Sequence, residues 1–145
     1  MRGTFTPKLD DKSRLTVPIK YREELGFHLT VVCEQEHCLA IYAKDVLDQQ
    51  MKTVNQASPT KLPVREYQRW VNSRAEDVDP DGQGRITITA LQRAWAGLDK
   101  EVIVIGAGER LEVWDRARWE EYSQALDARF ANFDGEIVPS GGRDA

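Results

Sequence analysis

A nine-residue motif occurs twice in this chain, and such self-similarity indicates a fold built from two like halves. Residues 10–18 read DDKSRLTVP and residues 81–89 read DGQGRITIT, so Asp, Arg and Thr recur in place while one aliphatic residue substitutes for another. After a one-residue insertion the similarity continues, with segments 30–32 and 39–42 matching 102–104 and 111–114. We therefore expect two tandem copies of one module.

Each copy has the pattern of a small, mainly β module. The segment from Asp to Arg predicts a tight loop between two strands, and a helix of about two turns follows it. Pro18 suits the first turn of the first helix and Gly26 its left-handed end, while Thr89 and Gly97 suit the cap and the end of the second. The β-branched runs TVVC and VIVI, followed by LAIY and LEVW, predict a hairpin in each copy, and a longer helix closes the module.

Two further stretches have helical spacing. Residues 64–76 follow Pro59 and Pro63 and carry apolar residues on one face, which predicts a connecting helix between the copies. The closing helix begins at Asp115 as an N-cap and has a stripe that belongs either to the core or to an interface, formed by Trp119, Tyr122, Leu126 and Phe130. From about residue 132 the periodicity is lost and glycine increases, so we expect a mobile tail.

The strands of a single module are too few to be stable alone, so the copies must complete each other. The simplest joint arrangement is a pseudo-symmetric closed β-barrel with swapped hairpins and external helices, which makes the fold class mainly β with helices (α+β). We divide the chain into a first module, a connecting helical segment, a second module, and a terminal helix with the tail: residues 5–50, 51–76, 77–120 and 121–145.

Charge is distributed unevenly, although the net charge is only -4. Residues 1–22 contain two acidic residues, Asp10 and Asp11, against six basic ones: Arg2, Lys8, Lys12, Arg14, Lys20 and Arg22. Such a basic patch fits a nucleic-acid partner despite the acidic total. No stretch has the roughly 20 apolar residues of a membrane helix, and the first residues lack the apolar run of a signal peptide, so we expect a cytoplasmic protein without a membrane partner.

Chemistry other than binding has little support in the sequence. Cys33 and Cys38 lie in predicted strands and are best interpreted as buried free thiols; a zinc site with His37 and His28 is the alternative, but the spacing matches no structural zinc pattern. Glycine-rich phosphate loops, nucleophile elbows and His-Glu metal motifs are missing from the sequence. We therefore predict no catalytic residue, no metal and no cofactor.

The repeated Asp-to-Arg loop is the candidate binding element. Asp10 and Asp81 head their turns, where a carboxylate can accept backbone N–H groups, and Gly84 relieves crowding in the second turn. Arg14 and Arg85 then leave equivalent turns, and an arginine held in this way can bind a phosphate or the N7/O6 edge of guanine. The alternative is a purely structural ion pair between each arginine and a nearby carboxylate.

The two loops differ in their surroundings. The first has basic neighbours, Lys12, Lys20 and Arg22, whereas Gln83, Leu91 and an acidic stretch lie near the second. We therefore favour Arg14 as the DNA-reading residue and expect Arg85 to be more structural. The other basic residues of this patch would contact the DNA backbone, namely Arg2, Lys12, Lys20 and Arg22.

The opening RGTFTPKLDDKSRLTVPIKYREEL, the second motif DGQGRITI and the closing VIVIGAGERLEVWD resemble the MraZ family, whose members carry two Asp-x-x-x-Arg half-modules of the AbrB type. The resemblance covers roughly residues 1–130. One departure is Ser13, where the family usually has glycine, and a slightly different backbone conformation is expected in the first turn.

The resemblance implies a ring-shaped homo-oligomer at the nucleoid that binds short direct repeats in double-stranded DNA upstream of the division and cell-wall gene cluster, including its own promoter. A ring would let one weak basic patch per subunit add up to tight binding. The alternative is a protein–protein interaction module that does not bind DNA, with an interface anchored by tryptophans: Trp70, Trp95, Trp114 and Trp119.

Overall fold

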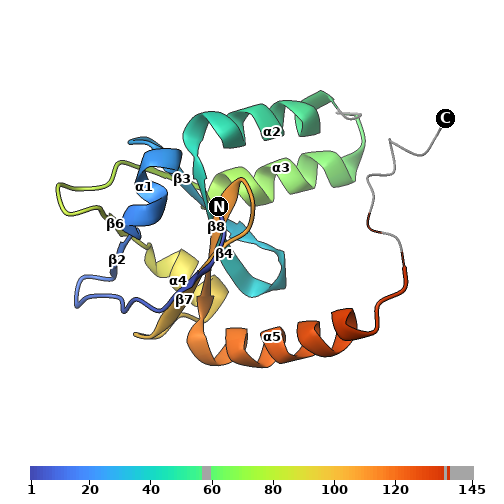
Figure 1. Ribbon diagram of the computed structural model, residues 1–145. Coiled ribbons are helices and arrows are strands. Elements are labelled where there is room, and N and C mark those ends of the chain that lie inside the picture. The colour runs from blue at the N-terminus through green and yellow to red at the C-terminus, as the bar shows by residue number, and fades with distance from the viewer. Residues whose placement is uncertain (57–59, 136, 138–145) are drawn as a thin grey trace.

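A computed structural model describes residues 1–56, 60–135 and 137 and shows a mixed α+β fold (Figure 1). Its centre is a six-stranded antiparallel sheet. In spatial order the strands are β1 (Thr4–Phe5), β7 (Val102–Gly106), β8 (Arg110–Asp115), β4 (Cys38–Ala43), β3 (Leu29–Glu34) and β5 (Glu76–Val78). A separate two-stranded ribbon consists of β2 (Arg14–Thr16) and β6 (Arg85–Thr87).

The strand order has an internal two-fold symmetry that follows the sequence repeat. Strand β1 of the first module pairs with β7 of the second, and β5 of the second module pairs with β3 of the first. The two hairpins meet where β4 pairs with β8, with Ala40 opposite Glu112 at the centre. Each module therefore gives its first strand to the hairpin of the other, as expected for copies that complete each other.

The closed barrel is not confirmed by the strand pairings of the described residues. The sheet ends at β1 and β5, and the ribbon pairs with neither edge. Instead, the ribbon packs against the sheet through side chains, since Leu15 and Ile86 join Val31 and Val104 in one buried cluster. The short strands of the ribbon contribute apolar contact to the sheet but no ladder of hydrogen bonds to its edges.

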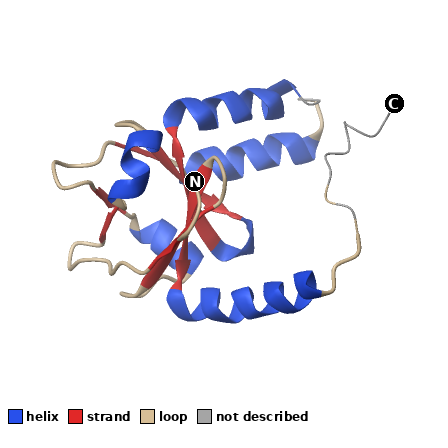
Figure 2. Ribbon diagram, viewed as in Figure 1, coloured by secondary structure: helices blue, strands red, loops and turns tan. Residues whose placement is uncertain are grey.

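Helices lie on both sides of the sheet (Figure 2). They are α1 (Ile19–Leu25), α2 (Lys44–Gln56), α3 (Leu62–Arg74), α4 (Ala90–Ala96) and α5 (Arg116–Ala131), with a short 3-10 turn, η1 (Gln35–His37), between β3 and β4. The predicted caps at Thr89 and Asp115 are confirmed, because each side chain accepts an N–H from the first turn of its helix. Gly97 is left-handed as predicted, whereas Gly26 has φ 78° but ψ -158° and so ends α1 differently.

The outer face of the sheet is covered in two halves. Helices α2 and α3 pack on β3 and β4 through Val32, Tyr42, Leu47 and Val71. Helix α5 covers β7 and β8 only with its first turns, where Trp119 and Tyr122 contact Trp114. The predicted stripe of α5 therefore has two parts: Trp119 and Tyr122 pack on the sheet, whereas Phe130 at the far end of the helix is half exposed. Most of the tail predicted to be mobile lies outside the described residues.

In each module, a buried polar side chain forms a hydrogen bond next to the strand that pairs with the other module, β1 or β5. Gln92 in α4 is fully buried, and its Nε2 donates to the carbonyl oxygens of Val31 at 3.2 Å and of Arg74 at 3.1 Å. Tyr21 occupies the equivalent place in α1, and its hydroxyl donates to the carbonyl of Arg2. The carbonyl of Arg74 lies just before β5, and the carbonyl of Arg2 lies just before β1. Each short helix thus anchors the strand that crosses from one module to the other.

Candidate nucleic-acid interface

The two Asp-to-Arg loops have the same internal geometry and project from the same side of the molecule (Figure 1). Asp10 Oδ1 accepts the backbone N–H groups of Lys12 and Arg14, both at 2.9 Å. Asp81 Oδ1 accepts those of Gln83 and Arg85, again at 2.9 Å. Each aspartate thus bonds to two backbone N–H groups of its own turn.

The same bonds keep both carboxyl groups ionised. The backbone N–H of Arg14 contributes most to holding the pKa of Asp10 below its ordinary value, and the N–H of Arg85 does the same for Asp81, whose pKa falls to about 2. Hydrogen bonds to the charged form of a carboxylate stabilise that form. At neutral pH each loop therefore contains a fixed carboxylate beside its arginine.

Each arginine is held by the second oxygen of its own aspartate. Arg14 Nε lies 2.6 Å from Asp10 Oδ2, and Arg85 Nε lies 2.8 Å from Asp81 Oδ2. The local ion pair considered from the sequence is thus present in both copies. This ion pair uses only the Nε atom of each arginine. Within the described part of the chain, the two outer guanidinium nitrogens form no hydrogen bond. The pair orients the guanidinium and leaves its two-pronged outer edge for a ligand.

The ribbon connects the two loops. Arg14 lies opposite Thr87 and Thr16 opposite Arg85, with the buried pair Leu15 and Ile86 between them. Each loop also bonds to the end of the other strand, because the carbonyl of Ser13 accepts the N–H of Ile88 at 3.0 Å and that of Gly84 accepts the N–H of Val17 at 2.9 Å. The two arginines are therefore placed by one continuous hydrogen-bonded unit.

Ser13 and Gly84 occupy the same turn position. Gly84 has φ 76° and Ser13 has φ 58°, so serine adopts the left-handed backbone that glycine adopts in the other copy. The expected slight difference in the backbone of the first turn amounts to 18° in φ (76° against 58°), within the same left-handed region. Since a side chain is disfavoured in this region, the serine carries local strain.

We expect the variant Ser13→Gly to raise the free energy of unfolding by roughly 0.5–1 kcal/mol. Relief of left-handed strain is worth about 1–2 kcal/mol, and the greater freedom of glycine in the unfolded chain offsets about 0.5–1 kcal/mol of it. Urea unfolding measures the change. As a control, Ser123→Gly in α5 should lower stability by about 0.5 kcal/mol, because glycine is a poor helix former. A loss of stability in Ser13→Gly would show that the serine side chain has a stabilising role.

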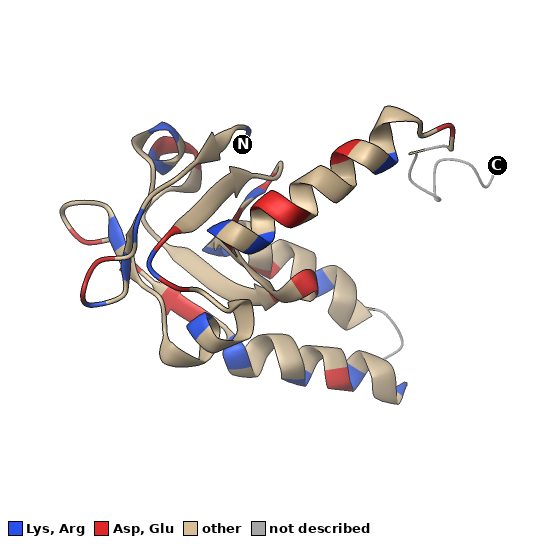
Figure 3. Ribbon diagram, turned by 90° about the horizontal axis from the view of Figure 1, so that it is seen from below, with Lys and Arg blue, Asp and Glu red and all other residues tan. Residues whose placement is uncertain are grey.

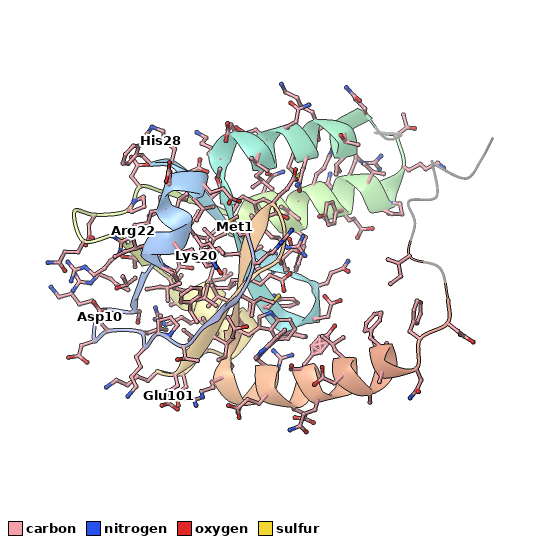
Figure 4. The ribbon with its side chains drawn as sticks, viewed as in Figure 1. Met1, Asp10, Lys20, Arg22, His28 and Glu101 are labelled. Atoms are coloured by element: carbon pink, nitrogen blue, oxygen red, sulfur yellow. The ribbon has the colours of Figure 1, made fainter. Side chains whose placement is uncertain are left out.

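The remaining residues predicted to contact DNA differ in whether their charged groups are free at the surface or bonded to the backbone. Lys12 and Arg2 are exposed, and exposed Lys20 lies with Nζ 5.8 Å from the centre of the Tyr21 ring. Arg22 instead donates from Nε to the Val17 carbonyl at 2.9 Å and from Nη2 to the Gln83 carbonyl at 3.1 Å. Asp10, Lys20 and Arg22 are labelled in Figure 4.

The link made by Arg22 explains the glycine in the second loop. A Cβ at residue 84 would lie 2.2 Å from Arg22 Cζ, so the guanidinium uses the space that glycine leaves. The equivalent residue in α4, Arg93, donates to the Ile88 carbonyl at 2.6 Å. Sequence reasoning did not find this bridging role, because counting basic residues does not separate exposed cations from those bonded to backbone.

The loops are not uniformly basic. Figure 3 shows basic and acidic residues side by side on them. Asp11 and Asp79 add negative charge, and Asp79 bonds to His28 at 2.9 Å. Asp10 and Asp81 are already paired with arginines. Lys12 lies in the turn of the first loop, and its side chain is exposed. The second loop has Gln83 at that place.

The residues of the alternative zinc site are separated. Cys33 and Cys38 are buried free thiols, as predicted, and burial raises the pKa of both. His37 stacks on Trp95 with ring centres 4.1 Å apart, while His28 bonds to Asp79. Among the described residues, no group of three or more His, Cys, Asp or Glu side chains is placed to hold a metal ion. Within the same residues, no helix combines the length and apolarity needed to cross a membrane.

Comparison with known proteins identifies close relatives. The family model described as "MraZ protein, putative antitoxin-like" matches residues 1–70 and 72–136, two segments that contain the two modules. The protein named transcriptional regulator MraZ of Corynebacterium urealyticum is 48% identical, covering 92% of this chain and 94% of the relative. The proteins of the same name from Corynebacterium diphtheriae and Saccharopolyspora erythraea are 43% and 44% identical, and each match covers 94% of this chain and at least 95% of the relative.

Proposed function

Because this chain belongs to the MraZ family, whose relatives are named transcriptional regulators, we propose that it regulates transcription by binding double-stranded DNA through the loops that precede β2 and β6. Arg14 reads bases, and the exposed cations Arg2, Lys12 and Lys20 contact phosphates. Arg22 supports this surface by bonding to the Val17 and Gln83 carbonyls. Arg85 holds the second loop and contributes less to sequence reading. The partner is DNA, with no cofactor.

The paired geometry of the two loops is the observation that supports this function. Each arginine is fixed at Nε by an ionised aspartate, and its outer edge is left to form two parallel hydrogen bonds. Guanine presents two acceptors, N7 and O6, in the major groove, and a two-stranded antiparallel ribbon fits that groove. A preoriented arginine also loses less conformational entropy on binding than a free one.

The proposal extends to assembly and target. Several subunits form a ring at the nucleoid in the cytoplasm, and their loops bind short direct repeats upstream of the division and cell-wall gene cluster, including the promoter of this gene. Supporting features are the half-exposed apolar residues at the end of α5, Phe130 and Phe133, which are 50% and 43% exposed. The centres of the two rings lie 5.2 Å apart and the rings form one apolar patch, and contiguous exposed apolar patches mark protein–protein interaction sites. Repetition around a ring would compensate for weak binding by each subunit.

We expect Arg14→Ala to weaken binding to DNA from upstream of its own gene by about 5- to 160-fold, because a bidentate base contact contributes about 1–3 kcal/mol. Wild-type affinity should fall steeply as salt increases, since phosphate contacts release counterions. The measurement is a binding titration at several salt concentrations. Arg129→Ala, at an exposed arginine near the end of α5, is the matched control and should bind like the wild type.

The variants must first show wild-type oligomer size and unfolding transitions. Equal binding by the wild type and Arg14→Ala would show that Arg14 is structural. Failure of the wild type to bind any DNA would instead favour the protein–protein interaction module, for which affinity to an apolar partner depends weakly on salt.

A further inference from the structure

We propose that Thr16 and Thr87, on the outer face of the ribbon, are specificity-determining residues that contact base edges beside the arginines. This inference rests on the proposed DNA binding. Side chains alternate across a strand, and here Leu15 and Ile86 point into the core while both threonines are exposed. The outward face of the ribbon therefore consists of two arginines and two threonines.

The register places each threonine next to an arginine of the other module. Thr87 lies directly opposite Arg14, and Thr16 lies directly opposite Arg85. Side chains opposite each other in an antiparallel pair have Cβ atoms about 4.5–5.5 Å apart. Along one strand, Arg14 and Thr16 are separated by two residues, or about 6.7 Å, which is close to two base-pair rises of about 3.4 Å. A ribbon lying in the groove would thus bring a threonine near the base pairs that flank each arginine contact.

Threonine has the chemistry for this role. Its hydroxyl can donate to or accept from base edges, and its methyl group can contact the methyl of thymine. Both threonines are exposed, and neither hydroxyl is hydrogen-bonded within the described part of the chain, so both are available to a ligand. Thymine presents both the O4 acceptor and the C5-methyl group in the major groove, so it is the base expected beside each guanine-binding arginine.

Comparison of the two copies indicates that the threonines serve for more than their preference for β-strands. Between the aspartate and the arginine, every residue differs: Asp11, Lys12 and Ser13 in the first loop are Gly82, Gln83 and Gly84 in the second. The outward residues of the ribbon are the same in both copies. β-Branched residues favour strands, but valine or isoleucine would satisfy that preference equally well. Retention of a polar β-branched residue beside each arginine fits a surface that meets base edges.

The test uses four variants, Thr16→Val, Thr16→Ser, Thr87→Val and Thr87→Ser, in the full chain. Valine removes the hydroxyl and keeps the shape, whereas serine keeps the hydroxyl and removes the methyl group. Binding is measured against its upstream DNA and a set of fragments in which each base pair is changed singly. We expect one variant at each position to lose about fivefold or more of the discrimination at one or two base pairs, with the salt slope unchanged.

Two controls define the outcome. Thr4→Val changes an exposed strand threonine outside the ribbon and should leave every base preference intact, whereas Lys12→Ala should weaken all sequences alike and reduce the salt slope by about one. If folded Thr16 and Thr87 variants keep all wild-type preferences, this inference is overturned while the proposed function stands. If the wild type binds no DNA, both fall together.

Discussion

Replacing Gln92 with leucine is expected to lower the free energy of unfolding by about 3 kcal/mol. Leucine has a similar size, but it cannot donate to the carbonyl oxygens of Val31 and Arg74 or accept from the Thr89 N–H. A buried polar group that loses its partner costs about 1–3 kcal/mol, and the three lost bonds join α4, β3 and the end of α3. Urea unfolding at constant protein concentration measures the effect.

The matched control is Gln124→Leu on the exposed side of α5, which should change stability by no more than about 0.5 kcal/mol. A decrease of similar size in both variants would mean that added surface hydrophobicity, not the buried bonds, causes the loss. A negligible effect of Gln92→Leu would show that the carbonyls find other donors.

The second large effect is expected for Ile86→Ala, which should cost about 3 kcal/mol of stability and also weaken DNA binding. Ile86 is 1% exposed and lies opposite Leu15 at the centre of the ribbon. Truncating it leaves a cavity beneath the unit that positions both arginines. Thermal unfolding and DNA titration should therefore change together, although residue 86 itself faces away from the proposed DNA surface.

Ile86→Val provides a graded comparison, because removal of a single methylene should cost only about 1 kcal/mol. Thr87→Ala, on the outer face of the same strand, tests the other side: stability should change by less than about 1 kcal/mol while base preference changes. Full DNA affinity in a destabilised but folded Ile86→Ala protein would contradict the positioning role of the ribbon.

Much of the fold is predictable because it is encoded locally or by the repeat. The alternating aliphatic segments predicted the two hairpins, and Thr89 and Asp115 predicted where their helices begin. The division into a sheet and a separate ribbon was not predictable, because it depends on pairings between distant strands that alternation does not specify. Gln92 was missed for the same reason: its burial results from contacts with β3 and α3, far away in the sequence.

In the candidate site, too, the local contacts were predictable from the sequence and the long-range contacts were not. The hydrogen bonds of Asp10 and Asp81 lie within five consecutive residues, so the sequence motif predicts them well. Arg22 looked like another exposed cation, but its bonds reach the loop of the other module. The preference for Arg14 over Arg85 stays a prediction, because each arginine pairs with the aspartate four residues before it and the two side chains are similarly exposed.

The exchange of first strands has a consequence for how the chain is made. Phe5 pairs with Val104, so at a synthesis rate of about 5–20 residues per second the partner of β1 leaves the ribosome roughly 5–20 s after β1 itself. Strand β5, in contrast, emerges after its partner β3 and can pair at once. The first strand to be translated is thus among the last to be placed, so β1 stays without its partner while most of the chain is made.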